Sequence, residues 1–158
     1  ARICANVPTD CNEDFSLTVR ELIFLGRYPH VTSMWWESRQ DESVVEDAIR
    51  QFNLEGLVDR RLNELSSGEK ERALLAKAVV QQPKILLADE PSAHLDLRYK
   101  LEVMERLWDL SRKGVAVLAA SHDINLMSKY CDRVLMISQG RTMGRLGLTL
   151  ERRKAGVV

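Results

Sequence analysis

The chain has 158 residues, of which 45% are hydrophobic and 29% are charged, values typical of one globular domain. These proportions exclude a disordered chain, a collagen-like chain and a small disulfide-rich protein. The 23 Lys and Arg residues balance the 23 Asp and Glu residues, so the formal charge at pH 7 is zero. Bulk charge therefore gives no indication of nucleic-acid binding.

No segment has the length or the apolar character of a membrane span. The longest strongly apolar run, at 115–120, falls far short of the ~20 residues that a bilayer requires. Nothing at the start is typical of a secretory signal. The three cysteines, Cys4, Cys11 and Cys131, are odd in number and lack Cys-x-x-Cys spacing. We therefore expect reduced thiols and a cytoplasmic protein.

Three capping boxes predict three helices in the first half of the chain. In such a box, a Ser or Thr side chain accepts a hydrogen bond from the backbone three residues later, and the Glu at that position bonds back. The boxes are Thr18–Glu21, Ser43–Glu46 and Ser66–Glu69. The residues expected to end these helices are Gly26 with Pro29, Gly56 and Pro83.

From Ile85 onwards the pattern changes from helical stripes to strands. Two continuous apolar runs, Ile85–Ala88 and Val115–Ala120, are typical of strands buried on both faces of a sheet. Between them, Asp96 is placed to cap a fourth helix, with Gly114 after it. The remaining predicted elements are a short helix at about Asp123–Tyr130, a strand at Arg133–Ser138 and, after a Gln139-Gly140 turn, a hairpin strand at Arg141–Arg145.

This order, helices first and then strand–helix–strand–helix–strand, predicts an α/β fold with parallel crossovers. In open parallel sheets, ligands bind beyond the carboxyl ends of the strands. Both apolar strands end in polar residues: Asp89 and Glu90 follow the first, and Ser121, His122 and Asp123 follow the second. We expect these side chains to converge on one edge of the sheet.

Asp89 and Glu90 are candidates for metal binding and acid–base chemistry. Because successive strand side chains point to opposite sides, the two carboxylates can take different roles. One can hold Mg²⁺, usually through water, and the other can orient or deprotonate an attacking water. A strand end followed by two solvated acids is an equally good interpretation of this pair taken alone.

Three further features have both a functional and a structural interpretation. Ser66, Ser67 and Gly68 lie where a helix begins, and the free N–H groups and dipole there favour an anion such as a phosphate, but an ordinary N-cap explains the same residues. Asp96 can simply cap the next helix. His122 can be a hydrogen-bonded structural residue instead of a catalytic one.

The glycine spacing excludes one phosphate-binding motif. None of the eight glycines has another glycine five positions away, so the loop Gly-x-x-x-x-Gly-Lys-Ser/Thr is absent from these 158 residues. That loop cradles phosphates with its backbone N–H groups. A nucleotide site built on it is therefore incomplete within this sequence.

Taken together and in order, these motifs resemble those of the ATP-binding cassette ATPases. Leu65-Ser-Ser-Gly-Glu69 is similar to the family's signature motif, and the apolar strand ending in Asp89-Glu90 is similar to its Walker B motif. Ser92-Ala-His-Leu-Asp96 resembles the D-loop, and Ser121-His-Asp123 resembles the switch-histidine segment. The resemblance covers about residues 7–147.

Longer segments indicate the type of transporter. Thr18-Val-Arg-Glu-Leu-Ile-Phe-Leu-Gly-Arg-Tyr-Pro-His30 is similar to the segment found in importers of iron–siderophore complexes, haem and cobalamin. The segments Ser92–Arg98 and Asp123–Met127 are similar to the same group. The resemblance implies the C-terminal part of a subunit that couples ATP hydrolysis to uptake of such a ligand.

The resemblance also implies roles at the strand ends, with ATP and Mg²⁺ as the cofactors. Asp89 would support Mg²⁺, and Glu90 would be the catalytic base that polarises the hydrolytic water. His122 would be the second catalytic residue, which contacts the γ-phosphate and senses its loss. These groups would complement the charge on the transferring phosphoryl group.

The signature residues are expected to bind the cofactor ATP from the opposite side. The resemblance implies that Ser66, Ser67, Gly68 and Glu69 close over ATP held by a second subunit, and that Asp96 couples the two sites of the dimer. Two residues depart from the family's pattern: Ser67 replaces the first of two usual glycines, and Glu69 replaces the usual Gln and adds negative charge.

The implied fold is a partial P-loop NTPase (RecA-like) parallel sheet with helices, plus an α-helical signature subdomain. We expect residues 1–9 and 81–147 to form the partial nucleotide-binding core, residues 10–80 the helical subdomain and residues 148–158 a divergent tail. The Walker A loop and the family's upstream β-rich segment are missing. Thr9 stands where the family has a Gln that contacts Mg²⁺ and the transport subunit.

The resemblance finally implies partners and a location. The full subunit would form a homodimer with a second ATPase subunit, bind a transmembrane permease subunit, and lie on the cytoplasmic face of the cell membrane. This chain by itself is expected to bind and hydrolyse ATP weakly or not at all. Two alternatives stay open: a non-catalytic interaction module, and a truncated product whose unpaired sheet edge prevents a stable fold.

Overall fold

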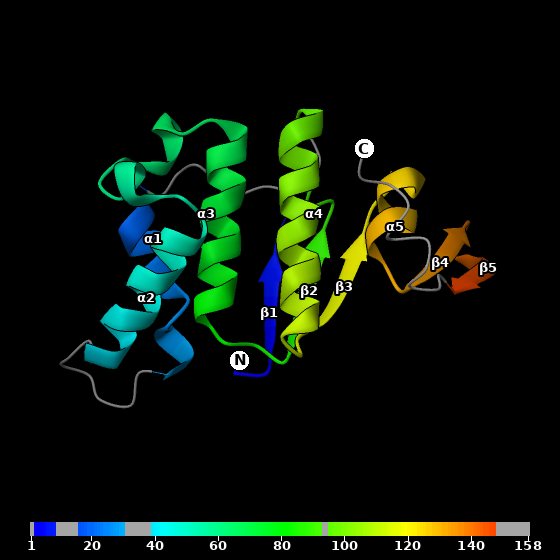
Figure 1. The fold of residues 1–158 in the computed structure, drawn as a ribbon, viewed down its shortest axis with the longest axis horizontal. Helices are drawn as coiled ribbons and strands as arrows, with labels where there is room; N and C mark the ends of the chain where they lie inside the picture. The colour runs from blue at the N-terminus through cyan, green and yellow to red at the C-terminus, as the bar shows by residue number, and fades with distance from the viewer. Residues whose placement is uncertain (1, 9–15, 31–38, 93–94, 148–158) are drawn as a thin grey trace.

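The computed structural model describes residues 2–8, 16–30, 39–92 and 95–147, which form a helical layer, a small sheet and a hairpin (Figure 1). The helical layer contains α1 (Val19–Leu25), α2 (Arg39–Gln51) and α3 (Ser67–Val80), with short 3₁₀ turns η1 (Tyr28–His30), η2 (Glu55–Leu57) and η3 (Leu62–Glu64). The sheet contains β1 (Cys4–Val7), β2 (Ile85–Asp89) and β3 (Ala116–Ala120). The remaining elements are α4 (Leu97–Arg112), α5 (Ile124–Tyr130), β4 (Arg133–Ser138) and β5 (Arg141–Gly147).

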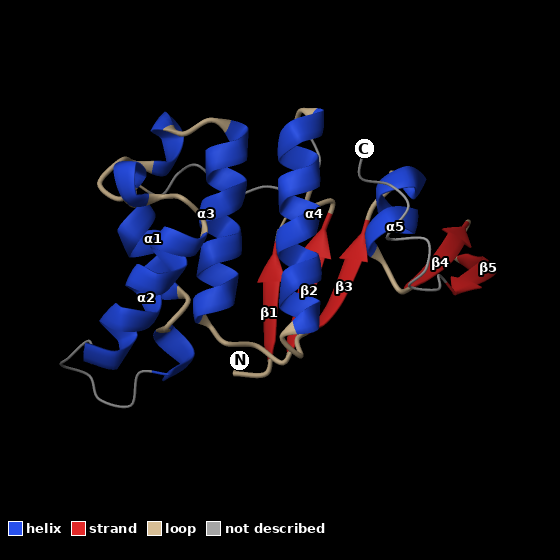
Figure 2. Cartoon of the chain, viewed as in Figure 1, coloured by secondary structure: helices blue, strands red, loops and turns tan. Residues whose placement is uncertain are grey.

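The sheet has the order β1-β2-β3 and is parallel throughout, so the predicted α/β fold is confirmed (Figure 2). Its register places Ile85 of β2 beside Cys4 of β1 and beside Ala116 of β3. Helix α4 makes the crossover from β2 to β3, as parallel pairing requires. The carboxyl ends of the three strands therefore meet at one edge.

The segment β4 does not continue this sheet, and the prediction of a further parallel strand there is wrong. Its ladder pairs antiparallel with β5 in a separate two-stranded sheet. The turn between them, Gln139-Gly140, has positive φ at both residues (48° and 71°), which a tight two-residue hairpin favours. The local turn thus brings β5 alongside β4. The expected hairpin is confirmed.

Local hydrogen bonds explain where two of the three predicted helices begin. Thr18 and Ser66 form capping boxes with the Glu three residues later, as expected. The start predicted at Ser43 is wrong, because α2 begins at Arg39. The side chain of Glu46 forms an ion pair with Arg20 of α1. Tertiary pairing thus uses the carboxylate that the sequence assigned to a cap.

The expectation that helices come first is also wrong, because β1 precedes them. This strand has only four residues, and its buried side chains, Ala5 and Val7, alternate with the exposed Cys4 and Asn6. So short an alternation gives a weak strand signal. Pairing with β2 over its whole length holds β1 in place. Thr9 and the predicted tail at 148–158 lie outside the described residues.

The sheet is buried on one face only, which corrects the prediction of strands buried on both faces. In β2, Leu86 is fully buried, whereas Ile85 and Leu87 are 40% and 36% exposed. Leu118 of β3 is 67% exposed. Apolar sequence reflects a strand's hydrophobicity but not which elements cover it. Among the described residues, helices cover one face and nothing covers the other.

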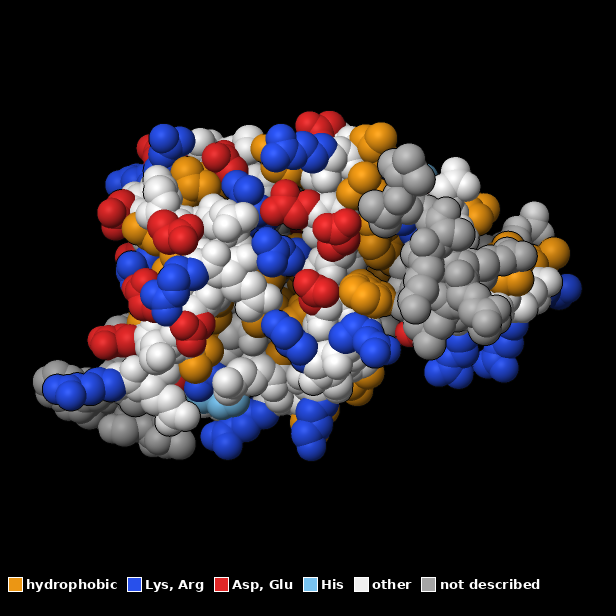
Figure 3. All heavy atoms as spheres, viewed as in Figure 1, with side chains coloured by type: hydrophobic (Ala, Val, Ile, Leu, Met, Phe, Trp, Pro, Cys, Tyr) orange, Lys and Arg blue, Asp and Glu red, His pale blue; other side chains and the backbone are white. Residues whose placement is uncertain are grey.

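The hydrophobic core lies in the helical layer and beneath α4. Ile23, Ile49, Phe52 and Leu75 are among its largest fully buried side chains. No described helix is both long enough and apolar enough to cross a bilayer. Acidic and basic side chains are interspersed over the visible face of the helical layer and α4 (Figure 3). This mixture agrees with the zero formal charge.

Candidate functional site

The candidate residues gather at one end of the molecule. The strands β1, β2 and β3 point the same way, and α3 and α4 both begin at the end toward which the strands point (Figure 1). Helix N-termini and the carboxyl ends of parallel strands are where open α/β sheets bind anionic ligands. The fold therefore places the predicted residues at this edge.

Glu90 adopts an unusual backbone conformation at the end of β2. Its φ is +47°, a left-handed value that is uncommon for a non-glycine residue. Its N–H donates to the carbonyl of Ala120 at 2.9 Å, which holds the residue against the end of β3. A residue held in this region is a candidate for function. Asp89, the last residue of β2, lies on the exposed face of the strand.

The structure brings Glu90 and His122 into direct contact. His122 Nδ1 lies 2.9 Å from Glu90 Oε1, although 32 residues separate them in sequence. The His122 side chain is 81% exposed, whereas that of Glu90 is 29% exposed. The other carboxylate oxygen, Glu90 Oε2, is buried and has no hydrogen-bond partner within the part of the chain that the structure describes. It can accept a hydrogen bond from a ligand or a water.

The start of α3 forms a complete cap. The Ser66 N–H donates to Glu69 Oε2 at 2.8 Å, and the Ser66 hydroxyl lies 2.7 Å from the same oxygen. These two hydrogen bonds lower the pKa of Glu69 below its ordinary value. The interpretation of Ser66 as an ordinary helix N-cap is therefore confirmed. It leaves Ser67 exposed at the first position of the helix.

Gly68 lies at a close approach between two helices. A Cβ added to it would lie 3.3 Å from two ring atoms of Tyr99, in the first turn of α4. Arg72, one turn further along α3, places its guanidinium carbon 5.9 Å from the centre of the same ring. Tyr99 thus joins the starts of α3 and α4. The sequence reasoning did not single out this residue.

Asp96 caps α4, since its carboxylate accepts a hydrogen bond from the Tyr99 N–H at 3.1 Å. The adjoining residues 93–94 lie outside the described part of the chain. No hydrogen bond links Ser66–Glu69 with Glu90 or His122 among the described residues. The candidate residues therefore form two groups: a strand-end pair, and the beginnings of α3 and α4.

No cluster of three metal-ligating side chains occurs among residues 2–8, 16–30, 39–92 and 95–147. A closed metal site of the zinc type is therefore absent from them. Magnesium fits the arrangement better, because it is commonly held by one or two carboxylates, with substrate phosphates and waters completing its shell. Asp89 and Glu90 offer such carboxylates at the sheet edge.

One acidic residue with a buried carboxylate oxygen was missed by the sequence reasoning. Glu71 lies in α3 one turn after Gly68, and its Oε1 is buried with no hydrogen-bond partner in the described structure. Burial raises its pKa to about 8. The only signal for it in the sequence is its position one turn before Leu74, on the helix face that carries Gly68.

The chain is similar in sequence to known transporter ATP-binding proteins. A family profile described as ABC transporter matches residues 4–93. Cobalamin import ATP-binding protein BtuD of Halobacterium salinarum is 37% identical over 89% of this chain and 35% of its own length. Petrobactin import ATP-binding protein FpuC of Bacillus anthracis is 38% identical over 89% of this chain and 52% of its own length. Hemin import ATP-binding protein HmuV of Bordetella avium is 36% identical over 89% of this chain and 56% of its own length.

This chain therefore spans from about a third to a little over half of the length of these relatives. Among solved structures, an inward-facing ABC transporter described as metal-chelate type superposes with a TM-score of 0.85 at 25% identity, covering 92% of this chain and 58% of that one. The protein cbiO1 of Clostridium perfringens, part of the transporter complex cbiONQ, superposes with a TM-score of 0.77 at 29% identity. The match covers 91% of this chain and 57% of that one.

Proposed function

Because the chain belongs to the ABC transporter family, we propose that it is the signature- and Walker B-bearing part of an importer ATPase for iron–siderophore, haem or cobalamin. The names of the relatives from Halobacterium, Bacillus and Bordetella support this range of ligands. The observation that carries the proposal is the Glu90–His122 contact at the sheet edge. Two groups suited to phosphoryl transfer meet there.

Glu90 is the proposed catalytic base. Its buried and unpartnered Oε2 can accept a proton from the attacking water, while Oε1 is held by His122 at 2.9 Å. The backbone hydrogen bond to Ala120 fixes the position of this carboxylate. His122, with 81% of its side chain exposed, can turn toward a γ-phosphate and report its loss through the hydrogen bond to Glu90.

Asp89 is the proposed support for Mg²⁺, acting through a coordinated water. Bound Mg²⁺ would neutralise charge on the phosphates of ATP. Asp89 suits the role because it ends β2 next to Glu90 and lies on the exposed face of the sheet. The chain's own contribution is to hold the two carboxylates on a rigid strand end.

The start of α3 is the proposed contact to ATP bound by a second subunit. Ser67 is exposed at the first helical position, and the helix dipole adds partial positive charge there. Ser66 and Glu69 shape this turn by capping each other, and Gly68 lets it pack on Tyr99. Asp96, which caps α4 beside it, is the proposed link between the two sites of the dimer.

The proposed partners are a second ATPase subunit and a transmembrane permease subunit, at the cytoplasmic face of the membrane. The solved cbiO1 belongs to a transporter complex, and another cassette, MJ0796, was solved as a dimer. In the proposed organisation, residues 1–9 and 81–147 belong to the nucleotide-binding core, and residues 10–80 form the signature subdomain. The exposed apolar face of β2 and β3 suits the interior of a larger core.

ATP turnover by the purified 158-residue chain tests whether it carries only part of a nucleotide site. The phosphate-cradling loop is absent from this sequence, so we expect magnesium-dependent hydrolysis no faster than buffer. Glu90→Gln is the matched control, since it removes the base and keeps the side-chain shape. Robust hydrolysis that Glu90→Gln abolishes would contradict the proposal.

A second candidate is a non-catalytic interaction module. Thr9 in place of the family's Gln and the absent phosphate-cradling loop favour it. A pull-down with a permease subunit, with and without ATP, separates the two candidates. Binding that responds to ATP supports the ATPase part, and binding that is identical in both conditions supports the module.

A further inference from the structure

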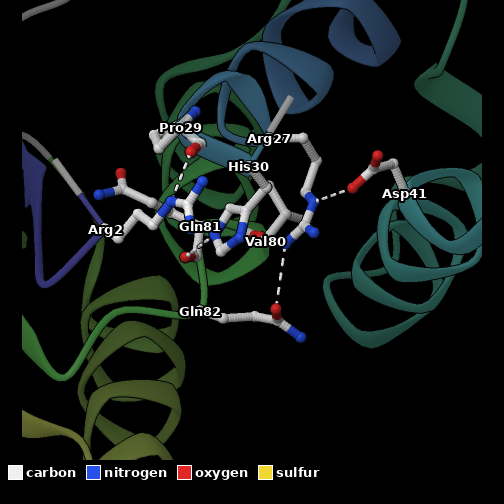
Figure 4. Close-up of polar contacts among 8 residues, drawn as sticks. All are labelled: Arg2, Arg27, Pro29, His30, Asp41, Val80, Gln81 and Gln82. Carbon is white, nitrogen blue, oxygen red and sulfur yellow. Dashed lines mark hydrogen bonds and ion pairs between the residues drawn. The ribbon is translucent and has the colours of Figure 1, made fainter. Parts of the chain in front are cut away.

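A polar cluster with a buried centre lies at the end of α3 opposite to Ser67 (Figure 4). Its centre is Arg27, which follows α1 and is only 5% exposed. Its Nε donates to Asp41 Oδ1 in the first turn of α2 at 2.7 Å. Its Nη1 donates to the carbonyl of Val80, the last residue of α3, at 2.6 Å, and to Gln82 Oε1 at 3.1 Å. One guanidinium, on a residue that directly follows α1, thus joins the start of α2 to the end of α3.

The residue before Arg27 strengthens the same junction. A Cβ added to Gly26 would lie 2.1 Å from the carbonyl oxygen of Lys77 and 2.5 Å from Val80 Cγ2. The end of α1 therefore rests directly on the last turn of α3, with no side chain between them. Gly26 gives the contact and Arg27 gives the charge. Together they fix the position of α3 at this end.

Further hydrogen bonds fasten the cluster to the sheet. His30 Nε2 lies 2.8 Å from the carbonyl oxygen of Gln81, which follows α3. The Gln81 side-chain amide donates to the carbonyl of Cys4 in β1 at 2.7 Å. Arg2 Nε donates to the carbonyl of Pro29 at 2.9 Å. The base of α3 is thus tied to β1 as well as to α1 and α2.

An arginine suits this place for physical reasons. The last carbonyls of a helix carry partial negative charge, and a cation there stabilises the helix. A buried guanidinium needs a buried carboxylate nearby, and Asp41, 8% exposed, provides it. The planar fork of Arg can bind a carboxylate and a carbonyl at once, whereas the single ammonium of Lys cannot match that geometry.

The other end of α3 carries the residues proposed to contact nucleotide. The helix has 14 residues, about 20 Å at 1.5 Å per residue, and no proline interrupts it. Gly68 rests on the Tyr99 ring at that end. A change in the direction of α3 set at its base therefore moves Gly68 against Tyr99.

We propose that Arg27 is a positioning residue, which sets the direction of α3 and thereby the place of Ser67 and Gly68 at the sheet edge. The inference that Arg27 thereby influences ATP binding rests on the proposed function. The placement itself does not, because it follows from the contacts of Arg27 with Asp41 and Val80. A displacement of the first turn of α2 would therefore be transmitted by this guanidinium to the end of α3 that carries Ser67 and Gly68.

The three tyrosines provide reporters for a test by ¹⁹F NMR of the whole chain labelled with 3-fluorotyrosine. Tyr28 lies in η1 beside the cluster, Tyr99 lies at the far end of α3, and Tyr130 lies in α5. Single Tyr→Phe variants assign the three signals. The Arg27→Met/Asp41→Leu double variant removes the pair without leaving one charge buried alone. Arg27→Lys is the milder second variant.

The matched control is Arg20→Met/Glu46→Leu. This pair also joins α1 to α2, but both side chains are 40% exposed and neither makes a hydrogen bond with α3 among the described residues. The measurement needs no nucleotide, so its failure is distinct from a failure of the proposed function. Unfolding midpoints are recorded for every variant to show that it folds.

The proposal predicts that both Arg27 variants move the Tyr99 signal by more than its line width and leave that of Tyr130 in place. The Arg20 control is expected to move neither signal. If Arg27 has only a local structural role, its variants should shift the Tyr28 signal and lower the unfolding midpoint but leave the Tyr99 signal unchanged. This result overturns the proposal. An equal shift of Tyr99 in the Arg20 control also overturns it. If the double variant does not fold, Arg27→Lys decides by the same criteria.

Discussion

The buried carboxyl of Glu71 predicts an unusual dependence of stability on pH. Burial alone raises its pKa from the ordinary value of 4.5 to about 8, with no partner for its Oε1 in the described structure. The folded state therefore binds this proton more tightly than the unfolded state does. The free energy of unfolding should be highest below pH 4.5, as far as this group is concerned, and should fall as the pH rises to about 8.

The magnitude follows from the two pKa values. At about 1.4 kcal/mol per pH unit, the full difference costs at most about 5 kcal/mol above pH 8, and about 3 kcal/mol of that is already lost at pH 7. Glu71→Gln keeps the shape of the side chain and removes the ionisation. We therefore expect this variant to unfold at pH 7 with a free energy about 3 kcal/mol higher than the natural chain.

The assay is urea unfolding, followed by circular dichroism between pH 5 and pH 8. Glu69→Gln is the matched control on the same helix, with the opposite sign. Its carboxylate has a lowered pKa because Ser66 donates two hydrogen bonds to it, so its stabilisation is constant from pH 5 to pH 8 and is lost only on further acidification. Equal stability of Glu71→Gln and the natural chain at both pH 5 and pH 8 would refute the reasoning.

Four further substitutions, of which Gly56→Ala is a control, test the packing and the caps by thermal or urea unfolding. Gly26→Ala should lower the free energy of unfolding by about 3 kcal/mol, because the new methyl group meets the backbone oxygen of Lys77. Gly56→Ala should change it by less than about 0.5 kcal/mol, because no atom lies within 4 Å of the added methyl group. Equal effects of the two substitutions would contradict the close approach at Gly26. Ser66→Ala and Asp96→Ala should each cost about 1 kcal/mol through loss of a helix cap, and no loss in either would mean that water replaces the cap.

The features predicted correctly from sequence depend on neighbouring residues. The caps at Thr18, Ser66 and Asp96 are formed by hydrogen bonds that span three residues, so their pattern is visible in the sequence. The Gln139-Gly140 turn is local in the same sense. The parallel sheet was also predicted, because two apolar runs separated by a helix have few other arrangements.

The errors arise where distant parts of the chain decide the outcome. Ser43 was assigned to a cap because nothing nearby shows that Glu46 pairs with Arg20, 26 residues away. The exposure of Leu118 depends on what covers the sheet, which an apolar pattern does not reveal. The strand β1 was missed because it is held by pairing with β2, about 80 residues later in the sequence.

In the candidate site, too, some features were predicted from sequence and others depend on contacts between distant residues. The positions of Glu90 and His122 at adjoining strand ends were predicted, because parallel strands bring their carboxyl ends together. Their roles in hydrolysis stay predictions. The Arg27–Asp41 pair was not predicted, since two oppositely charged residues 14 positions apart give no signal until a fold buries them together.

The central claim is that this chain supplies the hydrolytic carboxylate of an ATP-binding cassette. The most direct test joins it to a cassette segment that carries the Gly-x-x-x-x-Gly-Lys-Ser/Thr loop and measures magnesium-dependent ATP turnover. We predict turnover in the joined protein and a loss of at least about 100-fold in Glu90→Gln, with the unfolding midpoint retained. Turnover that is unchanged in a folded Glu90→Gln variant would contradict the claim.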